Sequence, residues 1–328
     1  MMRLIFILLA LTLCLNACVA ERLAPGPRPT TPHFVDGGHW QSADGFTLAY
    51  SEWPVASPSP SPTAVIVALH GMNDYGHFIE EAAKYWQKQG IATYAYDQRG
   101  FGRTEGNGRW PGADILAFDA RIFLNLVRAR HPQVKIFLLG ESMGGAVATL
   151  AAGQEGTPIA DGLVLVSPAY WGWSNLDLLK RSALWTAMQI APGGHLSGRG
   201  LNIRPSDNEQ MLIALGQDPY VIKSTRVDAT YGLVDLMEAA WKVRGNVSLP
   251  VLLLYARGDE VVPSGPIEQA ALEMPGTERV ICYSDGYHML LRDLQAERSW
   301  IEIAGFAKGP HPAAASKPPA HEGHTSCS

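Results

Sequence analysis

The chain has 328 residues, of which 47% are hydrophobic and 17% charged. This apolar fraction excludes a disordered chain, and the length suffices for one large domain or two ordinary ones. Lys and Arg number 26 against 31 Asp and Glu, a formal charge of −5, so the composition lacks the basic face of a nucleic-acid-binding protein. The 33 glycines and 23 prolines follow no period, which excludes collagen-like and solenoid folds.

The first residues have the pattern of an export signal. Arg3 precedes an apolar run that ends at Leu15 and is followed by small residues; this run is too short for a comfortable membrane span. We expect residues 1–20 to be a signal peptide. The sequence LNAC, ending at Cys18, resembles a bacterial lipobox, and lipidation there would attach the protein to a membrane surface. Simple cleavage after Ala20, giving a periplasmic or secreted protein, is the alternative.

Two further segments are expected to lie outside the folded domain. Residues 21–38 are proline-rich and are predicted to be a tether, and residues 309–328 lack apolar periodicity and are predicted to be disordered. Cys282 stands in an apolar stretch, which favours a buried thiol; a bridge to Cys327 after export is the alternative. The cysteines form no disulfide framework and no zinc-binding spacing, and we expect neither a metal nor a cofactor.

Residues 39–308 alternate predicted strands with predicted helices. A hairpin, Trp40–Ala43 and Phe46–Trp53, opens the domain, and continuous apolar runs follow, typical of strands buried on both faces. The expected strands are Thr63–Leu69, Ile91–Tyr96, Lys135–Leu139, Gly162–Val166, Val251–Tyr255 and Arg279–Tyr283, and the expected helices include Phe78–Gln89, Asp114–Arg130 and Met143–Gly153. The alternation predicts an α/β fold: a mostly parallel eight-stranded sheet with helices on both faces.

One long stretch interrupts this alternation. About residues 170–230 contain aromatic residues and helix formers but no convincing strand, and they follow the strand that ends at Val166. We interpret this stretch as a helical cap over the end of the sheet. The later part, Gly232–Arg244, is expected to pack on the core instead.

Ser142 is the candidate nucleophile. It lies in Gly140-Glu141-Ser142-Met143-Gly144, between a predicted buried strand and a small-residue helix. In that context G-x-S-x-G is typical of a nucleophile elbow, whose glycines permit a tight turn that exposes the serine hydroxyl. The backbone N–H of Met143 would then face the oxygen of a bound carbonyl.

A serine hydroxyl needs a neighbouring base, and the base needs a group that orients it. Asp259 follows the strand VLLLYA, and His288 follows the strand RVICY. Both stand at carboxyl ends of strands, where open α/β sheets place their sites, in the chain order serine, acid, histidine. Glu260 and Asp285 are the rival acids; Asp259 is preferred because it comes first after the turn.

A second donor for the developing oxyanion is expected in His70-Gly71-Met72, which follows the strand TAVIVAL. A turn there can direct the Met72 backbone N–H to the same point as Met143. A backbone donor requires no particular side chain, so His70 is interpreted as a packing residue that holds the turn.

The ordered motifs HGM, YDQRGFGRTEG, GESMGG, LVLVSPA, ARGDEVVP and GYHMLLRD cover about residues 40–307. Together they resemble the monoacylglycerol lipase and lysophospholipase branch of the α/β-hydrolases, also grouped as serine-aminopeptidase-like hydrolases. The resemblance implies a Ser142–Asp259–His288 triad, an oxyanion hole from Met72 and Met143, and a helical cap over an acyl-binding tunnel.

Two positions depart from the pattern of this branch. Glu141 stands where the animal lipases carry a histidine, and Thr104 replaces a frequent serine. Neither departure touches the expected chemistry. Asp97 and Arg99, in the same segment as Thr104, are interpreted as a buried carboxylate–guanidinium pair that holds a loop.

The expected activity is hydrolysis of carboxylic esters, with monoacylglycerols or lysophospholipids as substrates and an acyl-enzyme as intermediate. A peptidase or amidase and a thioesterase are alternatives that would use the same triad. A non-catalytic binding protein is the third alternative. No dinucleotide-binding or Walker A motif is present, which argues against redox and phosphoryl-transfer roles.

Overall fold

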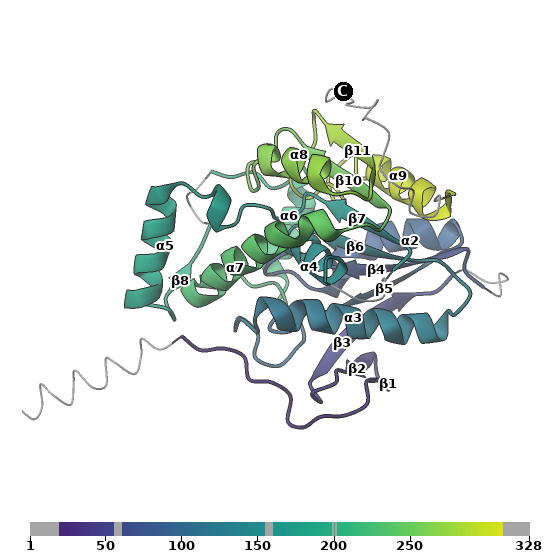
Figure 1. Ribbon diagram of the computed structural model, residues 1–328, viewed down its shortest axis with the longest axis horizontal. Coiled ribbons are helices and arrows are strands. Elements are labelled where there is room, and N and C mark those ends of the chain that lie inside the picture. The colour runs from purple at the N-terminus through teal and green to yellow at the C-terminus, as the bar shows by residue number, and fades with distance from the viewer. Residues whose placement is uncertain (1–19, 56–60, 155–159, 199, 201, 311–328) are drawn as a thin grey trace, which may run out of the picture.

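The computed structural model describes residues 20–55, 61–154, 160–198, 200 and 202–310. At its centre is a nine-stranded sheet with the strand order β1-β2-β3-β5-β4-β6-β7-β10-β11 (Figure 1). These strands are β1 (His33–Val35), β2 (His39–Gln41), β3 (Thr47–Trp53), β4 (Ala64–Leu69), β5 (Ile91–Tyr96), β6 (Ile136–Glu141), β7 (Gly162–Val166), β10 (Val251–Ala256) and β11 (Thr277–Tyr283).

The sheet is mostly parallel. Strands β5, β4, β6, β7, β10 and β11 pair in parallel, whereas β1, β2 and β3 join one edge in antiparallel pairs. Every residue of β4, β5, β6, β7 and β10 is buried, as expected for strands covered on both faces. The predicted α/β-hydrolase architecture is confirmed, with one strand more than the eight expected.

Helices cover both faces of the sheet. The helices α2 (Glu80–Lys88) and α9 (Glu297–Lys308) pack on one face, and α3 (Ala113–Arg130), α4 (Met143–Ala152), α7 (Val227–Val243) and α8 (Ser264–Glu273) pack on the other. Alternate residues of each strand enter the two cores: Val65, Val67 and Leu69 of β4 face α4, whereas Ile66 faces α2. The loops that follow the strands are therefore supported by a sheet that is buried on both faces.

The extra strand lies in the segment that we expected to be a tether. Within residues 21–38, β1 pairs with β2, and the backbone N–H groups of Arg28 and Thr30 donate to the carbonyls of Asp44 and Ala43 at 3.1 and 2.8 Å. Much of this proline-rich segment therefore lies against the domain. The predicted leader with Cys18 and the tail from residue 311, with Cys327, lie outside the described residues.

Cys282 differs from the free thiol favoured above, because it is disulfide-bonded. Its side chain is buried in β11. The other cysteines of the sequence, Cys14, Cys18 and Cys327, are all outside the described residues.

The chain leaves the sheet between β7 and β10 and forms the cap. Its elements before α7 are η2 (Trp173–Asn175), α5 (Leu178–Ile190), β8 (His195–Leu196), α6 (Glu209–Gln217) and β9 (Thr225–Arg226). The short strands β8 and β9 pair as an antiparallel ribbon. Helix α7 contacts α4 and is buried along one side, so the later part of the insertion packs on the core as predicted.

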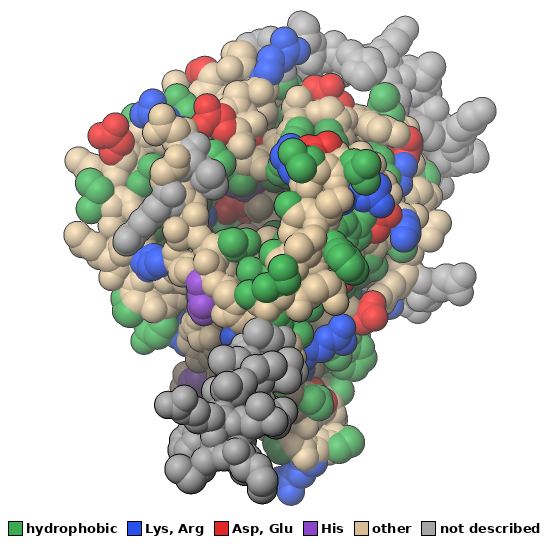
Figure 2. All heavy atoms as spheres, turned by 90° about the vertical axis from the view of Figure 1, so that its left-hand side faces the viewer, with side chains coloured by type: hydrophobic (Ala, Val, Ile, Leu, Met, Phe, Trp, Pro, Cys, Tyr) green, Lys and Arg blue, Asp and Glu red, His purple; other side chains and the backbone are tan. Residues whose placement is uncertain are grey.

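Helix α5 stands at the margin of the molecule (Figure 1). None of its residues is buried, and its apolar side chains include Leu178, Leu179, Trp185 and Ile190, which are exposed. Figure 2 shows hydrophobic side chains gathered around a hollow on the side of the molecule that carries α5. Among the described residues, every helix is too short or too polar to span a lipid bilayer.

Candidate active site

Ser142 lies in a tight turn between β6 and α4. Its backbone has φ 54° and ψ −118°, a strained conformation for a residue with a side chain. The turn is possible because its neighbours are glycines: a Cβ on Gly144 would lie 2.1 Å from the Leu69 carbonyl oxygen, and a Cβ on Gly140 would lie 2.2 Å from the Gly144 carbonyl oxygen. The sequence G-x-S-x-G therefore follows from steric limits at this turn.

Asp259 and His288 form a buried pair on the loops after β10 and β11. The Nδ1 atom of His288 lies 2.7 Å from Oδ2 of Asp259, and the side chains are 7% and 1% exposed. The other carboxylate oxygen accepts the backbone N–H groups of Val261 and Val262 at 2.8 and 3.0 Å. Because an ionised carboxylate only accepts hydrogen bonds, Nδ1 of His288 donates and Nε2 is left as the basic nitrogen.

The two rival carboxylates are engaged elsewhere. Glu260 accepts the backbone N–H of Arg204 at 2.7 Å, and Asp285 pairs with Arg298 at 3.0 Å in an exposed position. Asp259 is therefore the carboxylate that contacts His288.

The turn after β4 lies directly against Ser142. Strands β4 and β6 are parallel neighbours, with Leu69 opposite Gly140, so the residues that follow them emerge side by side. A Cβ on Gly71 would lie 3.3 Å from the Ser142 Cβ. The backbone N–H of Met143 is the first of α4 and has no acceptor within the helix. The turn that contains Met72 and the first residue of α4, Met143, therefore both adjoin Ser142.

The loop that carries His288 contacts the elbow through Arg292, whose guanidinium lies 3.1 Å from the Glu141 carboxylate. Burial raises the pKa of Glu141, next to Ser142 in the chain, and the charges of Arg292 and His288 oppose that rise. Within the described residues the Ser142 hydroxyl forms no hydrogen bond to His288; catalytic contacts of this kind are often long before substrate binds.

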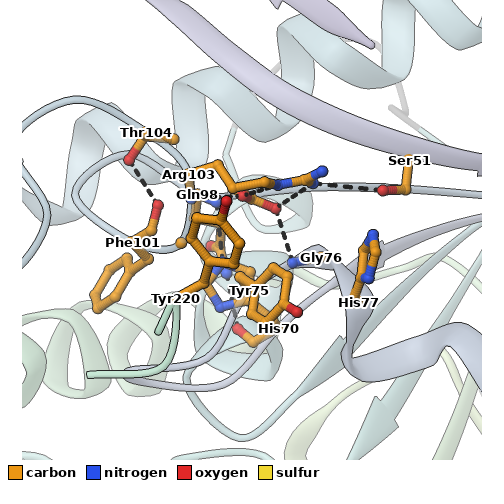
Figure 3. A network of polar contacts seen from close by, with 12 residues as sticks. Ser51, His70, Tyr75, Gly76, His77, Gln98, Phe101, Arg103, Thr104 and Tyr220 are labelled. Atoms are coloured by element: carbon orange, nitrogen blue, oxygen red, sulfur yellow. Dashed lines mark hydrogen bonds and ion pairs between the residues drawn. The ribbon is translucent and has the colours of Figure 1, made fainter. Parts of the chain in front are cut away.

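His70 stabilises the turn after β4 through hydrogen bonds. Its Nε2 accepts the backbone N–H of Gln98 at 2.9 Å, its Nδ1 lies 2.8 Å from the Gly71 carbonyl, and its own carbonyl accepts the Gln98 side chain at 2.7 Å. A backbone N–H can only donate and a carbonyl can only accept, so His70 is the neutral tautomer with the proton on Nδ1. Complete burial lowers its pKa. Figure 3 shows His70 and Gln98 side by side.

A buried charge cluster joins three of the loops around Ser142, and the sequence analysis missed it. Arg292, four residues after His288, pairs with Asp74 at 2.7 Å and with Glu141 at 3.1 Å. Asp74 follows the oxyanion turn and Glu141 precedes the nucleophile, so one guanidinium connects all three segments. The sequence signal was a set of charges inside otherwise apolar motifs, because such charges are rarely buried without partners.

Asp97 and Arg99 have structural roles, but they do not pair with each other. Arg99 contacts Asp44 and Asp119 at 2.5 and 2.7 Å, and Asp97 contacts Arg103 at 2.8 Å. The expected direct pair is therefore wrong, since both charges find partners from other parts of the chain. Thr104 accepts the Gly100 N–H at 3.1 Å and donates to the Phe101 carbonyl at 2.7 Å.

A cap segment is fastened to the histidine loop. The carbonyl of Pro205 accepts the Met289 N–H at 3.0 Å, and the Ser206 hydroxyl donates to Asp293 at 2.6 Å. The second oxygen of Asp293 accepts the backbone N–H of Tyr287, which precedes His288, at 2.9 Å. The described residues form no cluster of metal-ligating side chains.

The elbow, the Asp–His pair after the following strands and the cap between β7 and β10 define the class as an α/β-hydrolase. The chain belongs to the family described as serine aminopeptidase, S33, whose sequence pattern matches residues 60–295. The expected family resemblance is confirmed.

Named proteins agree with this assignment. The chain is 28% identical to monoglyceride lipase of Rattus norvegicus over 284 residues, covering 84% of this chain and 90% of the relative. It is 24% identical to monoacylglycerol lipase of Mycolicibacterium smegmatis over 222 residues, covering 67% and 77%. The crystal structure of Paleococcus ferrophilus monoacylglycerol lipase has the same fold, with a TM-score of 0.64, 20% identity, and coverage of 80% of this chain and 98% of that one.

Proposed function

We propose that the protein hydrolyses lipid esters, with monoacylglycerols or lysophospholipids as substrates, through a triad of Ser142, His288 and Asp259. The observation that carries this proposal is the buried 2.7 Å contact between His288 and Asp259, on loops after β10 and β11 of the same sheet whose strand β6 leads into the strained serine elbow. This arrangement supplies a nucleophile, a base and a group that orients the base.

In the proposed reaction, the Ser142 hydroxyl oxygen attacks the ester carbonyl carbon while its proton passes to Nε2 of His288. The backbone N–H groups of Met72 and Met143 hold the resulting oxyanion. Collapse of this intermediate breaks the bond to the alcohol, which leaves with the proton from His288. Water then attacks the acyl-enzyme, gives a proton to His288, and the second collapse releases the acid and restores Ser142.

The lipid substrate class is supported by two observations. Relatives covering most of this chain are named monoglyceride lipases, and the cap carries exposed apolar side chains on α5. An apolar cap suits an acyl chain better than a peptide backbone, whose polar groups would remain unpaired there.

A fluorophosphonate probe tests the nucleophile. We expect the wild-type protein to be labelled and to hydrolyse monoacylglycerols, and we expect Ser142→Ala to lose both properties. A series of acyl lengths on monoacylglycerols and lysophospholipids then identifies the substrate, and aminoacyl anilides test peptidase or amidase activity. Faster turnover of the anilides than of matched esters would replace the lipase assignment with a peptidase one.

We also propose that the protein is exported and attached to a membrane surface through lipidated Cys18, as the LNAC sequence suggests. Expression of the full chain with radiolabelled palmitate tests this. Label in the wild-type protein and not in Cys18→Ser supports lipidation, whereas an unlabelled, freely soluble exported protein supports simple signal cleavage.

A further inference from the structure

The Met72 N–H belongs to a four-residue turn, residues 71–74, with a positive φ at its third position. The Gly71 carbonyl accepts the N–H of Asp74 at 3.3 Å, and Asn73, the third residue, has φ 67°. A turn with a positive φ at its third position favours glycine or asparagine there. The turn's own hydrogen bond leaves the N–H of its second residue, Met72, available to a ligand.

Asn73 connects this turn to the cap. Its carbonyl accepts the backbone N–H of Ile222 at 2.9 Å, and its side-chain amide donates to the Thr225 hydroxyl at 2.6 Å. Thr225 belongs to β9 and lies opposite Leu196 in the cap ribbon. Both the backbone and the side chain of the residue after Met72 are therefore held by the cap.

A second contact lies beside the first. The Tyr75 hydroxyl donates to Asp218 at 2.8 Å, and its ring lies 5.6 Å from that of Tyr220 (Figure 3). The turn is thus bounded by His70 on the sheet side and by cap residues on the other side.

We propose that Asn73 is a positioning residue for the oxyanion donor Met72, and that Thr225 of the cap acts through it. This inference rests on the proposed function, because it assigns Met72 to the oxyanion hole. A glycine would satisfy the backbone at position 73 equally well. The asparagine side chain adds a hydrogen bond that fixes the turn relative to the cap, and an oxyanion hole depends on such preorganisation.

Three variants separate the amide from the backbone. Asn73→Gly keeps the positive φ and removes the amide, Thr225→Val removes only the accepting hydroxyl, and Thr225→Ser restores it. Ser224→Ala is the matched control, since Ser224 directly precedes β9 of the same cap ribbon and its hydroxyl bonds only weakly to the Leu196 carbonyl, at 3.5 Å.

The measurements are kcat and KM for a p-nitrophenyl ester and the inhibition constant of a trifluoromethyl ketone, which binds serine hydrolases as an oxyanion. Losing a whole oxyanion donor costs roughly 10²–10³ in rate, so misplacing one should lower kcat about tenfold or more in Asn73→Gly and Thr225→Val. We expect KM to change little and ketone binding to weaken by a similar factor. Thr225→Ser and Ser224→Ala should match the wild type.

An unchanged kcat and ketone affinity in Thr225→Val would overturn the assignment. So would a loss confined to KM, or a loss explained by a smaller fraction of fluorophosphonate-reactive protein, because either would mean a role in binding or folding alone. If the wild-type protein is not labelled, or if Ser142→Ala keeps its activity, the triad itself is contradicted and this inference falls with it.

Discussion

Asp259 divides its two carboxylate oxygens between His288 and a pair of backbone N–H groups. We expect Asp259→Asn to keep the fold, because an amide oxygen can still accept the backbone bonds. Its NH₂ group would face Nδ1 of His288 and favour the wrong tautomer, so kcat should fall by about 10³–10⁴. Steady-state kinetics on a p-nitrophenyl ester measure this, with Glu260→Gln as the control. Equal losses in the two variants would contradict the assignment of the acid.

His70 predicts a pH dependence of stability. Its folded pKa lies below the ordinary value of 6.5 because the ring is buried, so the unfolded chain binds the proton more readily. The contribution is present above pH 6.5 and is lost as the pH falls. We expect the free energy of unfolding in urea to decrease by about 1 kcal/mol from pH 7.5 to 5.5 through this residue. His70→Gln should have a shallower decrease; an unchanged slope would show that other groups cause it.

Sequence motifs were sufficient to place Ser142, Asp259 and His288 on loops after the carboxyl ends of β6, β10 and β11, because each residue follows a strand of the parallel part of the sheet. They were not sufficient to pair Arg99 with its carboxylates. Asp44 lies in an early hairpin and Asp119 within α3, and no local spacing relates either of them to Arg99. Such partners depend on how distant elements pack.

Arg292 ties together the oxyanion turn, the elbow and the histidine loop. Arg292→Met would leave Asp74 and Glu141 as buried carboxylates without their shared cation, and breaking a buried pair in this way typically costs about 3–5 kcal/mol. We expect a loss of that size in urea unfolding. Arg298→Met, which removes an exposed pair with Asp285, should cost at most about 1 kcal/mol. Similar losses in both would mean that the cluster is no more important than a surface pair.

Two glycines predict opposite responses to alanine. In α4, a Cβ on Gly144 would collide with the backbone of β4, whereas a Cβ on Gly305 in α9 meets no atom within 4 Å. Gly144→Ala should abolish folding or fluorophosphonate labelling, because a backbone contact cannot move aside. Gly305→Ala should raise the free energy of unfolding by roughly 0.5–1 kcal/mol. Thermal unfolding checks both, and a stable, fully labelled Gly144→Ala protein would contradict the steric account of the elbow.

The buried strands were predictable because their apolar runs are continuous, and each appears within one or two residues of its expected position. Strand β1 was not predictable in the same way. It has three residues, follows a proline-rich stretch and is not fully buried, so it lacks the apolar signal on which the other assignments depend. Its structure comes from pairing with β2.

The insertion between β7 and β10 contains one helix that packs on the core, α7, and one that does not, α5. Leu236 in α7 is fully buried, whereas Leu179 in α5 is 80% exposed. The same leucine-to-alanine change should therefore cost about 2–5 kcal/mol of unfolding free energy at position 236 and no more than about 0.5 kcal/mol at position 179. Urea unfolding of the two variants compares them directly. A large loss in Leu179→Ala would show that α5 supports the fold.

The cap is hydrogen-bonded to the rest of the domain both beside the nucleophile and beside the histidine, and these two attachments limit which parts of it can be exchanged. On the nucleophile side, Asn73 donates a hydrogen bond to Thr225 of the cap. On the histidine side, Asp293 accepts one from Ser206 of the cap. A cap grafted from another hydrolase would sever both connections at once, so chimeras that exchange the entire insertion should lose turnover even with substrates that both parents accept. Exchanging α5 alone spares both junctions, which makes that helix the natural unit for altering selectivity by recombination.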